Sequence, residues 1–102
     1  MTRLLVLYNQ PADTAAFDKY YFETHVPIAN RIPGLRSYKV SAAKPVVLAG
    51  DVSPYLVAEL EFDNMSDLQS ALGSAEGQAA AADVANFATA GVTLMTFDVR
   101  KA

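Results

Sequence analysis

The chain has 102 residues, a formal net charge of −3 and no cysteine, and 52% of its residues are hydrophobic while 19% are charged. This length predicts one domain over residues 1–102. The acidic balance argues against nucleic acid or an anionic membrane as a partner, because both need a basic surface. Without cysteine there is no disulfide, thiolate nucleophile or cysteine-ligated zinc site. So much apolar composition in a small domain predicts apolar surface that a second copy covers.

The N-terminal residues run directly into a strand pattern. Residues 3–8 are a nearly continuous apolar run that ends at the turn signal Asn9-Gln10-Pro11, as is typical of a central strand covered on both faces. Asp13 or Thr14 can cap the helix that follows. The apolar run is too short to cross a membrane and has no signal-peptide cleavage region. We therefore expect no membrane partner and a cytoplasmic protein.

The first helix is rich in aromatic residues and carries the histidine. We expect it to end near His25, because Pro27 disfavours helical geometry at the residue before it and lacks the N–H that would continue the ladder. A further helical turn over residues 28–32 ends at Pro33-Gly34. A second strand is expected over residues 35–41.

A loop and the clearest strand of the chain come next. Residues 42–54 contain proline, glycine, aspartate and serine at short intervals, which predicts a loop. Within it, the apolar residues 46–48 could contact a neighbouring strand edge. Residues 55–62 alternate strictly and predict a strand with two distinct faces: Leu56, Ala58, Leu60 and Phe62 on one, and Tyr55, Val57, Glu59 and Glu61 on the other.

The last part of the chain predicts a helix and a strand. Residues 66–69 have the spacing of a capping box and open the helix. Gly73 interrupts this helix, and Ser74 caps a continuation toward Phe87. The final strand is expected over residues 92–100.

The predicted order is strand, helix, strand, strand, helix, strand. Two helices between four strands indicate an α+β protein with a ferredoxin-like βαββαβ topology, in which an antiparallel sheet carries both helices on one face. The other face stays open, and the first and last strands still place apolar residues on it. Two such faces would bury each other, which predicts a homodimer through the open sheet face.

The only histidine is the first candidate for chemistry. Phe17, Tyr21 and His25 follow an i, i+4, i+8 spacing and form one stripe of the first helix. A partly enclosed imidazole could act as an acid or a base, or could bind haem iron if a haem were present. The structural alternative is a helix-end histidine that hydrogen-bonds the last carbonyls.

Three tyrosines are the next candidates. The phenols of Tyr8, Tyr21 and Tyr38 could donate a hydrogen bond to a developing enolate or to a carbonyl oxygen, and a His–Tyr pair suits proton transfer. The alternative is that each ring fills the core while its hydroxyl reaches the surface.

Two glutamates on one strand face complete the list. Glu59 and Glu61 could form a coupled acid pair, or bind a metal together with a histidine. A polar strand face explains them more simply, with Arg3 or Lys39 as the counter-charge. The glycines do not form a phosphate-binding loop after a strand. We expect no metal and no other cofactor.

The aromatic helix that ends in His25-Val26-Pro27, followed by Pro33-Gly34-Leu35, resembles the EthD family of dimeric α/β-barrel proteins. The resemblance covers nearly the whole chain, and its most specific part is the pairing of His25-Val26-Pro27 with Pro33-Gly34-Leu35. It rests further on Tyr8-Asn9, Phe17, Tyr20-Tyr21, Ile32, Tyr38, Phe62, Met65, Leu68, Glu76, Asp83 and Asn86-Phe87.

The resemblance implies a ferredoxin-like fold in which two sheets form a barrel on dimerisation. Relatives of this barrel class include cofactor-independent monooxygenases, muconolactone isomerases and polyketide cyclases, whose pocket lies between sheet and helices. At residue level the resemblance extends only to His25 and its neighbours.

The leading hypothesis is a small homodimeric protein that binds a hydrophobic, aromatic or ketonic small molecule. If the protein is catalytic, it performs cofactor-independent oxygenase, cyclase or isomerase chemistry, with His25 as acid/base and Tyr21 as its catalytic partner. Tyr8, Phe17 and Tyr38 are then the substrate-binding residues. The alternatives are a non-catalytic accessory or carrier protein for an oxygenase or degradation pathway, and a purely structural dimerisation module.

Overall fold

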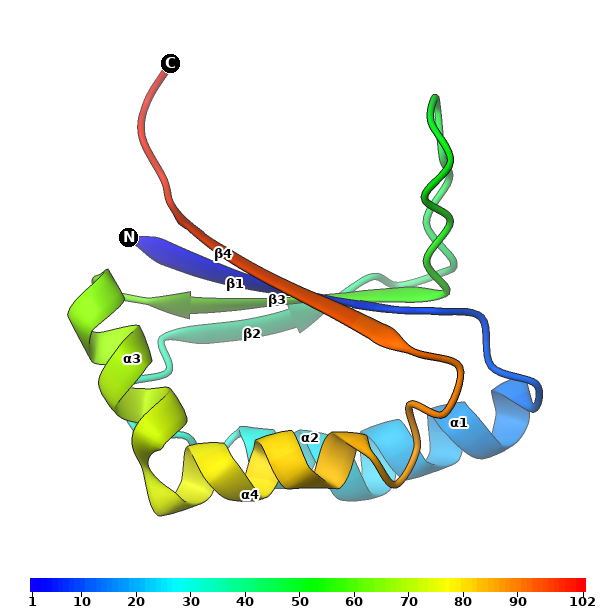
Figure 1. The fold of residues 1–102 in the computed structure, drawn as a ribbon, viewed down its shortest axis with the longest axis horizontal. Coiled ribbons are helices and arrows are strands. Elements are labelled where there is room, and N and C mark those ends of the chain that lie inside the picture. The colour runs from blue at the N-terminus through cyan, green and yellow to red at the C-terminus, as the bar shows by residue number, and fades with distance from the viewer.

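The computed structural model describes residues 1–102 and shows an antiparallel sheet with helices on one face (Figure 1). The sheet has four strands in the order β2-β3-β1-β4. The predicted α+β class and βαββαβ order are therefore confirmed. The elements are β1 (Thr2–Tyr8), α1 (Thr14–Tyr20), the π-helix η1 (Tyr21–His25), α2 (Val26–Ala29), β2 (Ser37–Val40), β3 (Leu56–Phe62), α3 (Met65–Gly73), α4 (Ala75–Val84) and β4 (Val92–Asp98).

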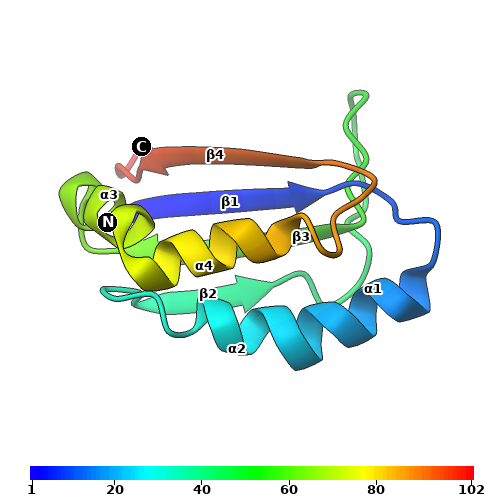
Figure 2. The same ribbon diagram turned by 60° about the horizontal axis from the view of Figure 1, so that its bottom comes forward.

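The core lies between the sheet and the helices. The two central strands alternate strictly between buried and half-buried residues, as the pattern of residues 55–62 predicts. The helices lie below the sheet in Figure 1, and Figure 2 shows α4 beside the continuous segment α1–η1–α2. The buried strand residues are Thr2, Leu4, Val6 and Tyr8 of β1 and Leu56, Ala58, Leu60 and Phe62 of β3.

The first helical segment does not end at His25, so that prediction is wrong. The chain passes through the π turn η1 and continues as α2 to Ala29. The N–H of Val26 donates to the carbonyl of Tyr21, five residues back. This wider turn places Pro27 in the first turn of α2, where its missing N–H leaves no hydrogen bond unmade.

The second helical segment begins two residues earlier than its capping box suggests. Helix α3 starts at Met65 because the Asn64 side chain, and not that of Ser66, accepts a hydrogen bond from the first turn. Ser74 caps α4 as predicted, accepting from the N–H of Gly77 at 3.0 Å. A Cβ at Gly77 would lie 2.0 Å from the carbonyl oxygen of Ala71, so only glycine permits this close approach of α4 to α3.

The loop between β2 and β3 stands away from the helices, on the open side of the sheet (Figure 1). Its apolar residues 46–48 form no strand, and Val46 and Leu48 are 83% and 94% exposed. The possible contact with a strand edge is not made by these two side chains, because they point into solvent although β2 lies at the edge of the sheet. The last strand is also shorter than predicted and ends at Asp98.

The open face of the sheet combines one charge cluster with apolar side chains. Arg3 on β1 pairs with Glu59 at 3.2 Å and with Glu61 at 2.6 Å, so Arg3 is the counter-charge of both glutamates. Apolar residues surround the cluster on the same face: Leu5 and Leu7 are half-buried, and Met95 and Phe97 are 46% and 44% exposed. None of the helices is long and apolar enough to span a bilayer.

Candidate functional site

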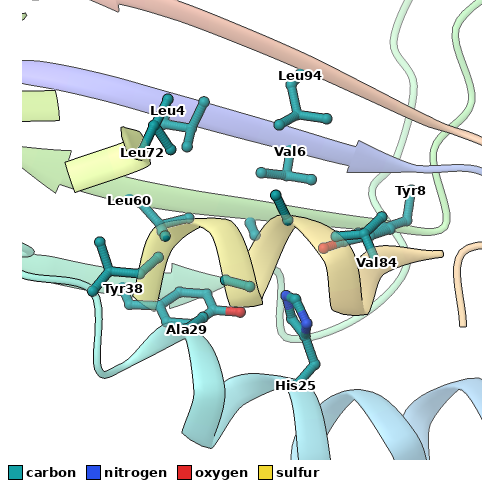
Figure 3. Close-up of a pocket in the computed structure, with 15 residues that line it drawn as sticks. Leu4, Val6, Tyr8, His25, Ala29, Tyr38, Leu60, Leu72, Val84 and Leu94 are labelled. Atoms are coloured by element: carbon teal, nitrogen blue, oxygen red, sulfur yellow. The ribbon is translucent and has the colours of Figure 1, made fainter. Parts of the chain in front are cut away.

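A small apolar cavity lies between the sheet and the helices (Figure 3). Its volume is about 70 Å³, and 13 of its 15 lining residues are hydrophobic. Three lining residues are exposed to solvent: Ala81, Leu72 (40%) and Leu94 (54%). The other lining residues are Leu4, Val6, Tyr8, His25, Ala29, Ile32, Tyr38, Ala58, Leu60, Gly77, Ala80 and Val84.

Three polar side chains face this apolar lining. Figure 3 shows the hydroxyl groups of Tyr8 and Tyr38 and the ring of His25 directed toward the same part of the cavity. They come from β1, β2 and η1, which are far apart in the sequence. The cavity can therefore enclose a small apolar group and hydrogen-bond a polar atom next to it.

His25 is buried at the end of the π turn. Its Nδ1 atom lies 2.9 Å from Oδ2 of Asp83 on α4, and its ring packs 4.7 Å from that of Phe87. The helix-end interpretation does not describe this residue, because the helix continues past it and the ring nitrogen bonds a carboxylate. With Nδ1 engaged, Nε2 is the nitrogen left to act on the cavity.

Asp83 is a buried carboxylate with three hydrogen-bond partners. Its Oδ1 atom accepts from the hydroxyl of Tyr20 at 2.6 Å and from the side-chain amide of Asn86 at 3.1 Å. Burial acts to raise the pKa of Asp83, but the hydrogen bonds with Tyr20, His25 and Asn86 outweigh it and hold that pKa below its ordinary value. The carboxylate therefore stays ionised beside His25.

The sequence analysis did not assign Asp83, Tyr20 or Asn86 to the site. One signal for Asp83 was available: with Gly77 and Ala80 it forms the buried stripe of α4, and it is the only charged residue on that stripe. A charged residue on an otherwise small and apolar helix face indicates a buried partner. Its partner could not be read from local spacing, because it lies 58 residues away.

Tyr21 lies next to the cavity-lining residue Tyr38 but outside the cavity itself. Its ring is fully buried and does not line the cavity, but its hydroxyl lies 2.5 Å from that of Tyr38. Burial raises the pKa of Tyr8, Tyr21 and Tyr38, so all three phenols remain protonated and able to donate hydrogen bonds. Tyr21 can therefore act on a ligand only indirectly, through neighbouring lining residues such as Tyr38.

Phe17, expected among the substrate-binding residues, lies outside the cavity. Its ring instead contacts that of Tyr8, which does line the cavity, with the two ring centroids 5.6 Å apart. Phe17 also packs against Tyr21, Tyr55 and Phe87. The helical stripe predicts correctly that these residues face the core, but the cavity lies only at the His25 end of it.

No group of three or more histidine, cysteine, aspartate or glutamate side chains lies close enough together to hold a metal ion. Glu59 and Glu61 lie on the opposite face of the sheet from His25, where Arg3 neutralises them. The glutamates and the histidine therefore belong to two separate places in the fold.

A four-stranded β2-β3-β1-β4 sheet with both helical segments on one face defines a ferredoxin-like α+β protein. The model of the EthD domain family matches residues 9–91. The chain belongs to the EthD family.

Individual proteins agree with this assignment. The chain is 44% identical, over 96% of its length and 94% of the relative, to an uncharacterized 11.0 kDa protein of the thcB–thcC intergenic region of Rhodococcus erythropolis. It is 39% identical to an EthD family protein from Bacillus halodurans, whose crystal structure superposes with a TM-score of 0.87 over 98% of this chain and 99% of that one.

A more distant structure shares the fold alone. It is described as a dimeric ferredoxin-like protein of unknown function from Thermobifida fusca. The two chains are 15% identical, with a TM-score of 0.69 over 96% of this chain and 90% of that one.

Proposed function

We propose that this protein binds a small apolar molecule with one carbonyl or phenol oxygen, and that His25 exchanges a proton with it. The observation that carries the proposal is a single imidazole, paired with a buried carboxylate, in a cavity otherwise lined by apolar side chains and two phenols. An enclosed apolar site strengthens hydrogen bonds and proton transfers inside it, because water does not compete.

The proposed step uses groups that the chain itself supplies. Nε2 of His25 accepts a proton from the carbon beside a carbonyl, and the electron pair of the broken C–H bond moves to the carbonyl oxygen. The hydroxyl of Tyr38 or Tyr8 donates a hydrogen bond to that oxygen as its negative charge develops. Asp83 stabilises the imidazolium, which returns its proton to another atom of the ligand and so isomerises it or prepares it for cyclisation.

The size of the cavity limits what can enter. Pockets that enclose drug-sized ligands measure roughly 300–1,000 Å³, whereas this cavity measures about 70 Å³. The oxygen-bearing end of the ligand therefore occupies the cavity, and its remaining apolar part extends outward past exposed lining residues such as Leu72 and Leu94. Narrow ketones with an apolar tail fit this description best.

The proposal is tested by solvent deuterium exchange. Wild-type protein in D₂O is incubated with a panel of alkyl and aryl methyl ketones, and deuterium beside the carbonyl is followed by NMR. We expect exchange for some members of the panel, and a fall of at least about 100-fold in the His25→Gln variant, in line with the usual contribution of a general base. The control variant Asp18→Asn changes a carboxylate that bonds Tyr55, away from the cavity.

The other outcomes discriminate between the functions. Saturable binding without exchange would make the protein a carrier, the accessory role considered above. Exchange that persists in His25→Gln would remove the histidine from the mechanism. No binding by any ketone of the panel would reject the cavity as a site for such ligands.

We further propose that the protein is a homodimer whose copies meet through the open sheet face. This arrangement is supported by the apolar side chains that lie together on that face: Leu5, Leu7, Met95 and Phe97. Contiguous apolar surface exposed to water favours association. The Thermobifida fusca protein with the same fold is described as dimeric, which is consistent with it.

A further inference from the structure

Two residues outside the cavity act on His25 through Asp83. Tyr20 and Asn86 both donate to Oδ1 of this carboxylate, while its Oδ2 faces Nδ1 of His25. Neither residue lines the cavity; both line a separate hollow between the start of α1 and the end of α4. Their hydrogen bonds therefore serve the carboxylate and not a ligand of the cavity.

The hydrogen bonds of Asp83 determine which ring nitrogen of His25 carries the proton. An ionised carboxylate only accepts hydrogen bonds, so the Nδ1 atom of His25 must carry the proton that Oδ2 accepts. A neutral imidazole with its proton on Nδ1 has its lone pair on Nε2, the atom available to the cavity. We infer that Tyr20 and Asn86 are positioning residues: they hold Oδ1 of Asp83 as their own acceptor and so orient this side chain with its other end toward Nδ1 of His25, where the carboxylate fixes the tautomer that can act as a base.

The replacement Asp83→Asn tests this inference because it keeps the size of the side chain but makes its two ends different. Tyr20 and Asn86 are expected to hold the amide oxygen at the Oδ1 position, because both donate there. The NH₂ group then faces Nδ1 of His25 and donates to it, and the imidazole proton moves to Nε2. In serine proteases the corresponding replacement lowers kcat about 10⁴-fold through the wrong tautomer.

The measurement is a two-bond ¹H–¹⁵N correlation spectrum of ¹⁵N-labelled protein in alkaline buffer, where imidazole is neutral. The chain has one histidine, so the spectrum contains one imidazole ring. In wild-type protein we expect Nδ1 to be protonated in a ratio of at least about ten to one, because a hydrogen bond to a charged group favours it by that factor or more. In Asp83→Asn we expect the reverse ratio.

Further variants assign the effect to Tyr20 and Asn86. With Asp83 intact, Tyr20→Phe leaves the tautomer unchanged, because a carboxylate accepts at either oxygen. Adding Tyr20→Phe and Asn86→Ala to Asp83→Asn frees the amide to turn, and the protonated Nδ1 returns. The matched control adds Tyr55→Phe, which removes a tyrosine–carboxylate bond to Asp18 elsewhere and leaves the reversed tautomer in place.

Either of two results overturns the inference: Nδ1 that stays protonated in Asp83→Asn, or a reversed tautomer that persists in the triple variant. If the triple variant does not fold, Asp83→Asn with Tyr20→Phe removes one of the two donors and is expected to shift the ratio part of the way back toward protonated Nδ1. The catalytic consequence rests on the proposed function, but the tautomer is measured without any ligand. The positioning role of Tyr20 and Asn86 can therefore be confirmed even if the protein exchanges no ketone protons. Equally, ketone exchange can be observed even if the tautomer does not respond to these residues.

Discussion

The two faces of the sheet use alternate residues of the same strands for different purposes. On the covered face, Leu4, Val6 and Tyr8 of β1 are buried under the helices and border the cavity. On the open face, Leu5 and Leu7 of that strand lie beside Met95 of β4 and remain partly exposed. A period of two along a strand thus separates the residues that form the core and the site from those available for association.

The polar groups of the two faces differ in the same way. Asp83 under the covered face is buried, and both of its oxygens are held by neighbouring side chains. The pairs of Arg3 with Glu59 and Glu61 on the open face are partly exposed to water, which screens such pairs. The carboxylates on the two faces therefore contribute differently to stability, because burial strengthens the hydrogen bonds of Asp83 while water weakens the ion pairs of Glu59 and Glu61.

The largest difference in stability between the two faces is expected when one phenylalanine on each face is replaced by alanine. Phe62→Ala on the covered face should lower the free energy of unfolding by about 3–5 kcal/mol, because its ring is fully buried. Phe97→Ala on the open face should cost less than half as much, since Phe97 is 44% exposed. Urea unfolding at several protein concentrations measures both. Equal losses would show that the open face is as well packed as the core.

The next effect concerns association. Phe97→Glu places a charge on the apolar open face and should weaken a homodimer at least about 100-fold, or ~2.7 kcal/mol, because a buried, unpaired charge opposes the interface. Light scattering over a dilution series gives the dissociation constant. Ala82→Glu, at an exposed position of α4 on the helical side, is the control and should leave it unchanged. A monomeric wild-type protein would contradict the proposed dimer.

Acid should act on the covered face through Asp83. Its pKa is lower in the folded protein than in the unfolded chain, so its hydrogen bonds stabilise the fold above the unfolded pKa, and this stability is lost as the pH falls through the folded pKa. Asp83→Asn should cost on the order of 1–3 kcal/mol at neutral pH and flatten the acid dependence of unfolding. An unchanged slope between wild type and variant would contradict this assignment.

The smallest effect is expected in the loop between β2 and β3. Leu48→Ser should change the free energy of unfolding by less than about 0.5 kcal/mol, because Leu48 is 94% exposed and makes no core contact. The same unfolding experiment measures it, at a concentration below dimerisation. A larger loss there would show that this loop packs on the domain in solution.

Local patterns in the sequence determined most of the fold. The alternation in residues 55–62 predicts which side of β3 is buried, and Ser74 predicts the start of α4. Such signals depend only on the period of a strand or on a cap, which the nearest neighbours define. The same period places apolar residues on the open face, and the lone histidine marks the candidate base.

Only the tertiary structure decided how the candidate site is assembled. Pro27 predicts a helix end, but a preceding π turn accommodates it equally well, and local sequence does not choose between them. Three features of the site depend on how distant elements pack. His25 pairs with Asp83 across 58 residues, the hydroxyl of Tyr21 contacts that of Tyr38, and Phe17 lies outside the cavity. Contacts between elements that are distant in the sequence leave no periodic pattern along the chain. The sequence therefore identifies His25 as a candidate base, but only the tertiary structure shows that Asp83 is its partner.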